Sequence, residues 1–389
     1  MRKALTFILA LMLMACSSSS DEVEKTPSQE EEKQPMLSFY VYAPEHPLLT
    51  RATVGDVDPI GEEAKVNSLQ IWVFETANGK LVAYYEPKSS DIEKLKTNEG
   101  DVYQVPVTHD FANRRPRVDV FVLANATNST VGSNATRAEL EAALLSKTVF
   151  GYETLARTVP EAGLPMSGVL KDQPVTGEKP VLRIGTDFSA MATVRLVRAV
   201  SKLRFVFSAL TGSNLAITGI TIGAGDTGWM TDEEYLFLNQ PYNGSNYNIK
   251  SYLSSAVPFI SAAESPLAVK EVTDPLEYIF IDGVEDAQDY ETRICVAIDA
   301  QTLTSWGPFY LPESDKQLTG TVTYTVGGGA EVTANFSMAD AGEADAGDFT
   351  RNHTWLVYAY YGDAVLQFNL VDVDSWTDKD VKNHDVYNW

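Results

Sequence analysis

A glycine-rich stretch is the first place where residue spacing alone suggests a chemical site. Gly223, Gly225 and Gly228 have the spacing of a dinucleotide-binding loop, and an apolar stretch precedes them. In such a site the loop leads directly into a helix whose N-terminus holds the pyrophosphate. Residues 229–241 lack a sustained helical period of apolar residues, and an Asn-Gly turn follows them. We therefore interpret the stretch as a glycine-rich connection between strands.

Residues suited to acid–base catalysis or metal binding are scattered along the chain. The histidines are His46, His109, His353 and His384. None lies in a His-Glu-x-x-His motif, and the chain has no Gly-x-Ser-x-Gly motif. One acidic loop lacks the ligand spacing of a calcium loop: Asp340, Glu343, Asp345 and Asp348. A second acidic group could bind a cation weakly or mark a charged strand end: Asp372, Asp374, Asp378 and Asp380. We predict no enzyme activity, no cofactor and no metal site.

Aromatic pairs and a single cysteine are the remaining candidates for chemistry. Tyr84-Tyr85 and Tyr360-Tyr361 could stack on sugars, although alternate aromatic residues in strands usually face the core. Cys295 lies in the apolar stretch 294–298, where we expect it to act as a small buried hydrophobic residue.

The first residues have the layout of an export signal. Met1-Arg2-Lys3 supplies positive charge, residues 4–15 are apolar, and Cys16 follows. The apolar stretch is too short for a permanent membrane-spanning helix, so we interpret residues 1–15 as a signal peptide. Leu13-Met14-Ala15-Cys16 resembles a lipobox, in which Cys16 becomes the lipidated first residue. A signal peptide that ends near a cysteine by chance is the alternative.

Composition describes the part that would follow the signal peptide. Residues 16–36 are rich in Ser, Glu, Lys, Gln and Pro, and we expect a flexible tether because such a segment buries little apolar surface. Cys295 is the only cysteine after Cys16, so an intrachain disulfide is not expected and the core must hold the fold together. The 389 residues suffice for two domains. A formal charge of −23 argues against nucleic acid or an anionic membrane surface as a partner.

Short runs that alternate apolar and polar residues predict strands in the first half of the chain. The clearest runs are 37–42, 69–74 and 81–85, and Asn78-Gly79 predicts a hairpin turn between the last two. Residues 118–123 are apolar on both faces apart from Asp119, so they should lie centrally in a sheet. Thr136 and Glu139 form a capping-box pattern, which predicts a short helix.

A second group of strands is predicted after about residue 190. Its runs are 194–207, 215–222, 278–281, 294–298, 321–326, 331–336, 355–361 and 365–373. We predict two hairpins among them, one that turns at Gly327-Gly328-Gly329 and one that turns at Gly362-Asp363. Many short strands separated by turn signals predict an all-β protein, with one or two short helices and two β-sandwich domains. We place the domains at residues 37–190 and 191–389.

Several pieces of the sequence occur in the order found in one known family, and the chain resembles the fimbrillins, the type V pilins of the Bacteroidia. Besides the lipobox cysteine, the matching pieces are residues 37–41, 50–52, 69–74, 120–125, 164–168, 194–203, 351–355, Trp376 and the ending 387–389. The resemblance implies two transthyretin-like β-sandwich domains in tandem. It also implies a lipid, such as palmitate, on Cys16 and a place in the outer membrane before maturation.

The resemblance further implies how such a subunit matures. An arginine-specific protease would cut between Arg51 and Ala52 and release strand 37–42, with its apolar residues Leu37, Phe39 and Val41. The groove left behind would expose unpaired backbone groups, which are a template for another strand. A strand from the next subunit would fill the groove, and head-to-tail donation gives a filament.

The C-terminal segment 377–389 is the natural donor under this scheme. Its apolar residues are Val381, Val386, Tyr387 and Trp389. Residues 377–385 are more polar than a typical donor strand, which leaves open whether the subunit belongs to the stalk, the tip or an accessory position.

The predicted function is that of a structural subunit of a surface fimbrium that supports adhesion. Its partners would be other fimbrial subunits, the protease and a surface receptor of unspecified kind. It would occupy the outer membrane as a lipidated precursor and the extracellular fimbrium afterwards.

The rival function from another class is that of a monomeric surface lipoprotein that binds glycans and keeps its lipid. An enzyme built on a β-sandwich is a further rival. In a bacterial lipoprotein, the Asn-x-Thr glycosylation motifs at Asn125, Asn134 and Asn352 are interpreted as chance.

Overall fold

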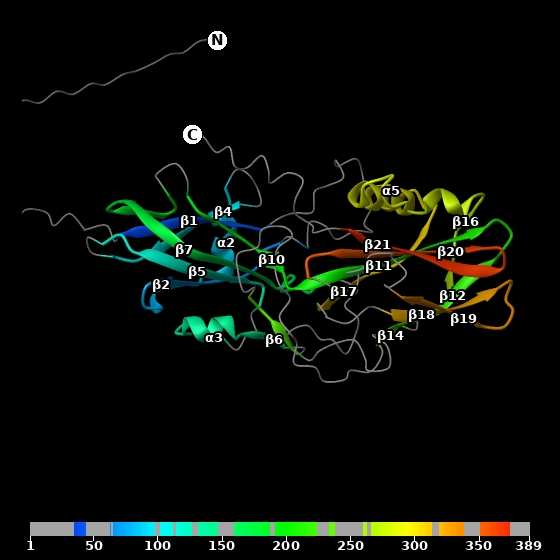
Figure 1. Ribbon diagram of the computed structural model, residues 1–389, viewed down its shortest axis with the longest axis horizontal. Coiled ribbons are helices and arrows are strands. Elements are labelled where there is room, and N and C mark those ends of the chain that lie inside the picture. The colour runs from blue at the N-terminus through cyan, green and yellow to red at the C-terminus, as the bar shows by residue number, and fades with distance from the viewer. Residues whose placement is uncertain are drawn as a thin grey trace, which may run out of the picture. The chain divides into compact units, whose positions relative to one another are not determined.

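The computed structural model describes thirteen stretches of the chain. They are residues 35–43, 63, 65–97, 102–111, 114–126, 131–146, 159–186, 191–223, 233–237, 260–262, 266–312, 319–337 and 351–373. Strands dominate these stretches, which confirms the all-β fold class (Figure 1).

Nine strands form the N-terminal sheet system. They are β1 (Met36–Tyr42), β2 (Leu69–Glu75), β3 (Lys80–Tyr85), β4 (Val102–Thr108), β5 (Arg117–Ala124), β7 (Met166–Glu178), β8 (Val181–Ile184), β9 (Thr193–Arg195) and β10 (Val197–Arg198). Their order is β3-β2-β5-β7-β8-β1-β4, with β10 paired to β7 and β9 paired to β1. The predicted hairpin is confirmed, since β2 and β3 pair antiparallel around the turn at Asn78-Gly79. The predicted central position of residues 118–123 is also confirmed, because β5 lies between β2 and β7.

Strand β7 connects two layers of this system. Its first part pairs with β5, and its last residues, Val175–Glu178, pair with β8. Side chains from both layers meet in one buried cluster, in which Ile71 and Val122 of one layer join Phe39, Val105 and others of the second. The arrangement is a β-sandwich with its core between the layers.

Two short helices accompany the N-terminal sheets. Helix α2 (Ser89–Leu95) connects β3 to β4, and Ile92 is its buried residue. Helix α3 (Arg137–Glu141) begins with the predicted capping box: the Thr136 hydroxyl accepts from the Glu139 amide, and the Glu139 carboxylate accepts from the Thr136 amide. A short ladder pairs β6 (Leu144–Ser146) with β13 (Glu233–Tyr235).

The C-terminal half contains two five-stranded sheets. The first has the order β16-β11-β20-β21 with β17 on β11, and the second has the order β14-β12-β18-β19 with β15 on β12. The first sheet comprises β11 (Val200–Leu210), β16 (Glu271–Val272), β17 (Thr304–Pro312), β20 (Thr354–Gly362) and β21 (Val365–Val373). The second comprises β12 (Leu215–Gly223), β14 (Ile260–Ala262), β15 (Leu267–Ala268), β18 (Thr319–Val326) and β19 (Val332–Ser337). Both predicted hairpins, β18–β19 and β20–β21, are confirmed.

The core of this half lies between its two sheets. Leu203, Phe205 and Phe207 of β11 pack with Ile217 of β12 and Val322 of β18 in one buried cluster. The edge-to-face contact of Phe205 with Phe336 joins the sheets, with 5.5 Å between ring centroids.

Two predicted strands are wrong. Residues 294–298 lie in α5 (Ala287–Asp299). Of the strand expected over 278–281, Tyr278 ends a 3-10 helix, η2 (Pro275–Tyr278), and residues 279–281 form neither helix nor strand. The reason in α5 is helical spacing: Tyr290, Ile294 and Ile298 recur every four residues and pack on the outer face of β11, β20 and β21. The Asp286 carboxylate caps the helix by accepting from the Gln288 amide at 2.9 Å.

Strand pairing places the boundary between the N-terminal and C-terminal sheets slightly after residue 190, where the sequence predicted it. β9 and β10 follow residue 190 but pair with β1 and β7. The next strand, β11, pairs only with strands of the C-terminal half in the described part of the chain. Contacts group residues 34–389 into one unit, so the division into two tandem domains stays a prediction.

Candidate functional site: strand β1 and its groove

Strand β1 is an inner strand of the N-terminal sandwich and has partners on both edges. Along one edge all seven residues pair antiparallel with β4, with Phe39 opposite Val105. Along the other edge β1 pairs parallel, first with β8 and then with β9. The Met36 amide donates to the Pro180 carbonyl at 2.8 Å, and the Tyr40 amide donates to the Ala192 carbonyl at 3.0 Å. β1 therefore joins β4, on one of its edges, to β8 and β9, on the other.

One face of β1 is fully buried. Leu37, Phe39 and Val41 are each 0% exposed and belong to the main N-terminal core cluster. Tyr40 and Tyr42 on the other face are half-buried. Burying a large apolar side chain contributes about 1.5–3 kcal/mol. Three such side chains thus contribute about 5–9 kcal/mol, which is comparable to the whole stability of a typical domain, about 5–15 kcal/mol.

The groove around β1 is lined by apolar residues of the neighbouring strands. From β4 come Tyr103, Val105 and Val107, and from β8 come Leu182 and Ile184, all less than 3% exposed. Without β1 these side chains and two rows of backbone groups would face water. An extended segment with apolar residues at alternate positions has the right chemistry to replace it.

Glu63, which follows the predicted cleavage site, is bound by residues outside the β1 groove. Glu63 is fully buried, and its carboxylate accepts from the Tyr310 hydroxyl at 2.5 Å and lies 3.2 Å from the Lys202 ammonium. The Glu63 carbonyl also accepts from Arg198 Nε at 3.1 Å. β1 and Glu63 are thus anchored by separate contacts, β1 by β4, β8 and β9, and Glu63 by β10, β11 and β17.

Sequence reasoning did not identify Glu63. The available signal was the presence of Arg198, Lys202 and Arg204 within an apolar run, since a buried cation requires a partner. All three are at most 2% exposed. The sequence could predict that a partner exists, but it could not identify Glu63, which lies 139 residues from Lys202.

Several predicted site residues lie outside the described residues. These are the lipidation site Cys16, the cleavage pair Arg51 and Ala52, and the donor residues Val381, Val386, Tyr387 and Trp389. Their roles stay predictions. The last described strand before the donor segment is β21, which ends at Val373.

The residues weighed for metal or cofactor chemistry have other environments where the structure describes them. Among the described residues no group of three or more His, Cys, Asp and Glu side chains could hold a metal ion. Asp372 pairs with His353, whose Nδ1 lies 2.9 Å from a carboxylate oxygen. The His109 ring packs against Phe111, and burial lowers the pKa of His109. Gly223 is the last residue of β12, and the rest of the glycine-rich stretch lies outside the described residues.

In two of the three glycosylation motifs the asparagine is buried. Asn125 and Asn352 are at most 3% exposed and have positive φ angles of 59° and 63°. The Asn125 amide donates to the carbonyls of Lys65 and Leu164, at 2.7 and 2.9 Å. It therefore ties the end of β5 to the chain before β2 and the chain before β7.

Two of the tyrosines considered for sugar stacking, Tyr84 and Tyr360, pack against other aromatic rings of the protein. The Tyr84 ring lies 5.4 Å from Trp72, and its hydroxyl donates to Glu86 at 2.6 Å. Burial, together with the bond to Glu86, raises the pKa of Tyr84 to about 12. Tyr360 is 8% exposed and stacks on Tyr358. Cys295 is buried, as predicted, with its sulfur 3.5 Å from Arg204 Nη1.

The fold and this site define an all-β protein whose first strand fills a groove that other strands form. Residues 47–194 match a model of the major fimbrial subunit protein (FimA) family. Over these residues the chain is similar to that family. No curated protein matches the sequence. None of the helices in the described residues is both long and apolar enough to cross a membrane.

Solved structures with related descriptions are similar over most of the chain. One is a candidate cell adhesion protein from Parabacteroides distasonis, 15% identical, with a TM-score of 0.49, covering 89% of this chain and 99% of that one. A fimbrial assembly protein from the same organism is 14% identical, with a TM-score of 0.48 and coverages of 88% and 97%. The C-terminally truncated tip fimbrial protein Mfa3 from Porphyromonas gingivalis is 15% identical, with a TM-score of 0.42 and coverages of 88% and 99%.

Proposed function

We propose that this protein is a structural, non-enzymatic subunit of a bacterial surface fimbrium, supports adhesion, and polymerises when β1 is exchanged for a strand of a neighbouring subunit. The observation that carries the proposal is the place of β1, which is paired on both edges and buried through Leu37, Phe39 and Val41. A surface lipoprotein that stayed monomeric would not require this strand to be separable from the rest of the fold.

Proteolysis supplies the separation in this proposal. A cut between Arg51 and Ala52 breaks the only covalent link between β1 and the strands that follow it. Glu63 stays bonded to Lys202, Tyr310 and Arg198, so the new N-terminal segment remains attached while β1 becomes free to leave. The buried area makes spontaneous loss of β1 unfavourable, and an incoming apolar strand offsets that cost.

Export precedes these steps. We propose that Cys16 carries the lipid, that residues 16–36 act as a tether, and that the precursor sits in the outer membrane until the cut releases it. The segment 377–389 then serves as donor strand, with Val381, Val386, Tyr387 and Trp389 as its apolar residues. The polar character of residues 377–385 also suits a tip or accessory subunit, which needs the acceptor groove alone.

The experiment compares Arg51→Ala with Thr50→Ala, a neighbouring substitution that keeps the arginine. Cells producing each variant are examined by mass spectrometry of the mature N-terminus and by electron microscopy of surface fibres. Thr50→Ala should begin at Ala52 and form fibres, whereas Arg51→Ala should remain an acylated monomer. Fibres built from uncut Arg51→Ala would overturn the proposal.

Position along the fibre is tested by removing residues 377–389. A stalk subunit without its donor should cap growing fibres and leave short polymers. A tip subunit without the segment should still join fibres at one end. Fibre length, measured by electron microscopy, distinguishes the two.

A further inference from the structure

Charge is distributed very unevenly along the chain. Residues 1–200 contain 21 Lys and Arg against 26 Asp and Glu, whereas residues 201–389 contain nine against 27. The two halves therefore carry −5 and −18 of the total of −23. Most of the net negative charge lies in the second half, because that half has fewer lysines and arginines.

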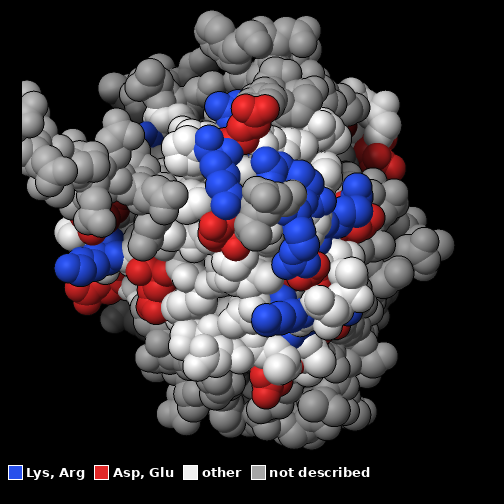
Figure 2. Space-filling model, turned by 90° about the vertical axis from the view of Figure 1, so that its left-hand side faces the viewer, with Lys and Arg blue, Asp and Glu red and all other residues white. Residues whose placement is uncertain are grey.

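Exposed cations gather at one end of the N-terminal sandwich, which we call the basic pole: Lys80, Arg114, Arg115, Arg117 and Lys179. Strand registers place these residues at the same end, because Lys80 pairs with Glu75, Glu75 pairs with Val118, and Arg117 pairs with Pro174 near the β7–β8 turn. Figure 2 views this side of the molecule and shows lysine and arginine side chains collected there, with aspartate and glutamate side chains among them.

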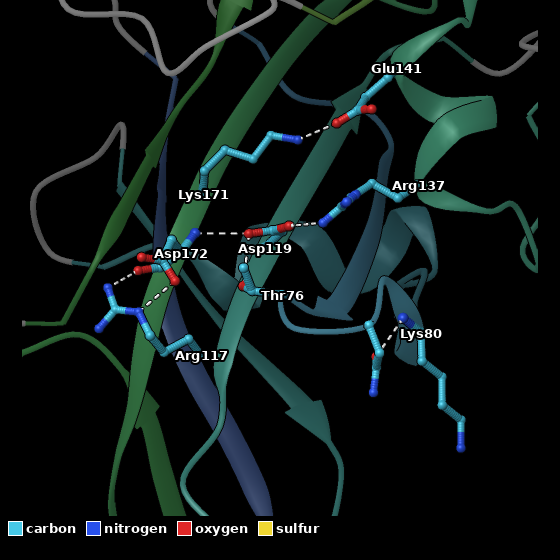
Figure 3. A network of polar contacts seen from close by, with 9 residues as sticks. Thr76, Lys80, Arg117, Asp119, Arg137, Glu141, Lys171 and Asp172 are labelled. Atoms are coloured by element: carbon cyan, nitrogen blue, oxygen red, sulfur yellow. Dashed lines mark hydrogen bonds and ion pairs between the residues drawn. The ribbon is translucent and has the colours of Figure 1, made fainter.

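Ion pairs hold the basic pole in place and offset part of its positive charge, since Arg114 pairs with Glu75 at 2.8 Å and Lys179 pairs with Asp110 at 2.6 Å. Arg115 donates from Nε and Nη2 to the Gly177 carbonyl, at 3.0 and 2.7 Å, and Arg117 pairs with Asp172 at 2.5 Å. Beneath them Asp119, which is 2% exposed, accepts from the Asp172 amide and the Thr76 hydroxyl and pairs with Arg137 at 2.8 Å (Figure 3). Because these bonds connect β5, β7, the β2–β3 turn and α3, the pole is an ordered surface with oriented guanidinium groups.

Turns of the C-terminal sandwich form a surface of opposite sign, the acidic pole: Glu271, Glu331 and Asp363, with exposed Leu210, Val332 and Val365. Registers again bring the turns to one end. Ala209 pairs with both Glu271 and Tyr361, and Leu215 pairs with Val326. The Glu271 carboxylate accepts from the Gly212 and Asn214 amides at 2.9 and 2.7 Å, and the first-named bond is the main reason that its pKa is lowered.

We propose that the basic pole of one copy docks on the acidic pole of a neighbouring copy and so orients the two copies for strand exchange. Both poles also carry exposed apolar residues, Val181 at 46% beside Lys179, and Val365 at 52% beside Asp363. Apolar centres rimmed by opposite charges are suited to each other. The basic pole is also the end at which β1 enters the sheet, since Met36 pairs with Val181.

The role of docking in strand exchange rests on the proposed function. The docking itself does not require cleavage of the chain. Complementary charges mainly accelerate encounter, by about tenfold or more at low ionic strength. At about 1 M salt the Debye length falls to ~3 Å and the acceleration should vanish. Docking should therefore change the rate and salt dependence of assembly more than the final length of the fibre.

The first test uses the uncut full chain, so its outcome does not depend on polymerisation. Copies labelled with ¹⁵N and unlabelled copies are mixed at low ionic strength and treated with a carbodiimide, which joins lysine to a contacting carboxylate. Lys80 or Lys179 of one copy should be joined to Glu271, Glu331 or Asp363 of the other. Mixed-isotope products that instead lead to the acids near α5, such as Glu277 and Asp289, would overturn the proposal, as would their absence.

The second test exchanges the charges of the cleaved subunit. Arg115→Glu with Arg117→Glu should slow association about tenfold at low salt, as should Glu331→Arg with Asp363→Arg. An equimolar mixture of the two variants should recover the wild-type rate. Lys88→Glu with Lys94→Glu is the control of equal charge, since these exposed residues lie at α2, which contacts β4 at the opposite end of the N-terminal sandwich. Equal slowing by this control, or no recovery in the mixture, contradicts docking between the poles.

Failure of the proposed function gives a different pattern. If wild-type protein cleaved after Arg51 stays monomeric while the cross-links between poles form, strand exchange is wrong and docking stands. If fibres grow at the same rate in all variants, docking is wrong and strand exchange stands.

Discussion

Strands β1 and β11 are both buried inner strands, but they differ in their position along the chain. β11 has ten buried residues among eleven and pairs with β16, β17 and β20. The fold continues on both sides of it, from β10 before it to β12 after it. β1 pairs with β4, β8 and β9, and among the described residues the other strands all follow it. Under the proposed function, the cut after Arg51 would separate β1 from those strands, whereas releasing β11 would need a cut on each side of it.

Under the proposed function, β1 is exchangeable because of its place in the chain and not because it is weakly packed. Leu37 and Phe39 are as fully buried as Leu203 and Phe205, all at 0% exposure. A poorly packed first strand would be easy to remove but would leave a precursor prone to aggregation through its open groove. Full burial would keep the proposed precursor closed until the chain is cut.

The largest expected difference comes from Phe39→Ala and Phe205→Ala. In the uncut protein each should lower the free energy of unfolding by about 3–5 kcal/mol, because each leaves a cavity in a core. In fibres Phe39→Ala should have no effect, since β1 has left, while Phe205→Ala should remain destabilising. Urea unfolding of the uncut chain and thermal dissociation of fibres measure the two effects. Fibres weakened equally by both substitutions would show that β1 stays in place.

Glu63→Gln tests whether the chain after the cut is anchored independently of β1. It removes the charge that faces Lys202 and should cost about 3–5 kcal/mol in both cut and uncut forms. Glu93→Gln is the control, because its pair with Lys96 is exposed and should contribute about 0–1 kcal/mol. Chemical denaturation of both forms gives the comparison. A loss seen only before cleavage would mean that Glu63 depends on β1.

Gly168→Ala perturbs the acceptor groove without touching β1. A Cβ at this position would collide with the Arg195 carbonyl and the Val194 side chain of β9, the strand that pairs with β1. The expected cost is about 1–3 kcal/mol, accompanied by weaker strand acceptance. Gly132→Ala is the control, since a Cβ there meets no atom within 4 Å. Thermal unfolding and binding of a synthetic peptide of residues 36–42 to the cut subunit provide the readouts.

The smallest expected effect is at the cap of α3. Thr136→Ala removes the bond to the Glu139 amide and should cost about 1 kcal/mol. The Thr136 backbone amide, followed by its hydroxyl, lowers the pKa of Glu139 in the folded protein. The stabilisation is therefore present above the unfolded pKa of about 4.3 and is lost as the pH falls through the folded value. Thermal unfolding of wild type and Glu139→Gln should differ at pH 7 and converge under acid conditions.

The elements predicted correctly depend on local chemistry. Asn78-Gly79 specifies the β2–β3 turn, with Gly79 at φ 66°, and Thr136 with Glu139 specifies the start of α3. Alternation over residues 37–42 predicted both the strand and the face that is buried. In each case the deciding residues lie within a few positions of one another, so the sequence displays them directly.

The helix α5 shows where local reading fails. Ile294, Val296 and Ile298 have side chains that favour strands, and the short apolar run around Cys295 was interpreted accordingly. The wider window from Asp286 to Asp299 has a cap and a four-residue apolar spacing, and packing on β11, β20 and β21 stabilises the helix. A window of five residues cannot separate the two periods.

By itself the sequence determined the strand-rich class, the main hairpins, the capped helix and the apolar face of β1, because each depends on neighbouring residues. Only the tertiary structure decided that β1 lies between β4 and β8/β9 and that Glu63 pairs with Lys202. These contacts join segments far apart in the chain, and many alternative pairings satisfy the same alternation. The choice among them comes from packing the whole core at once, which no local pattern records.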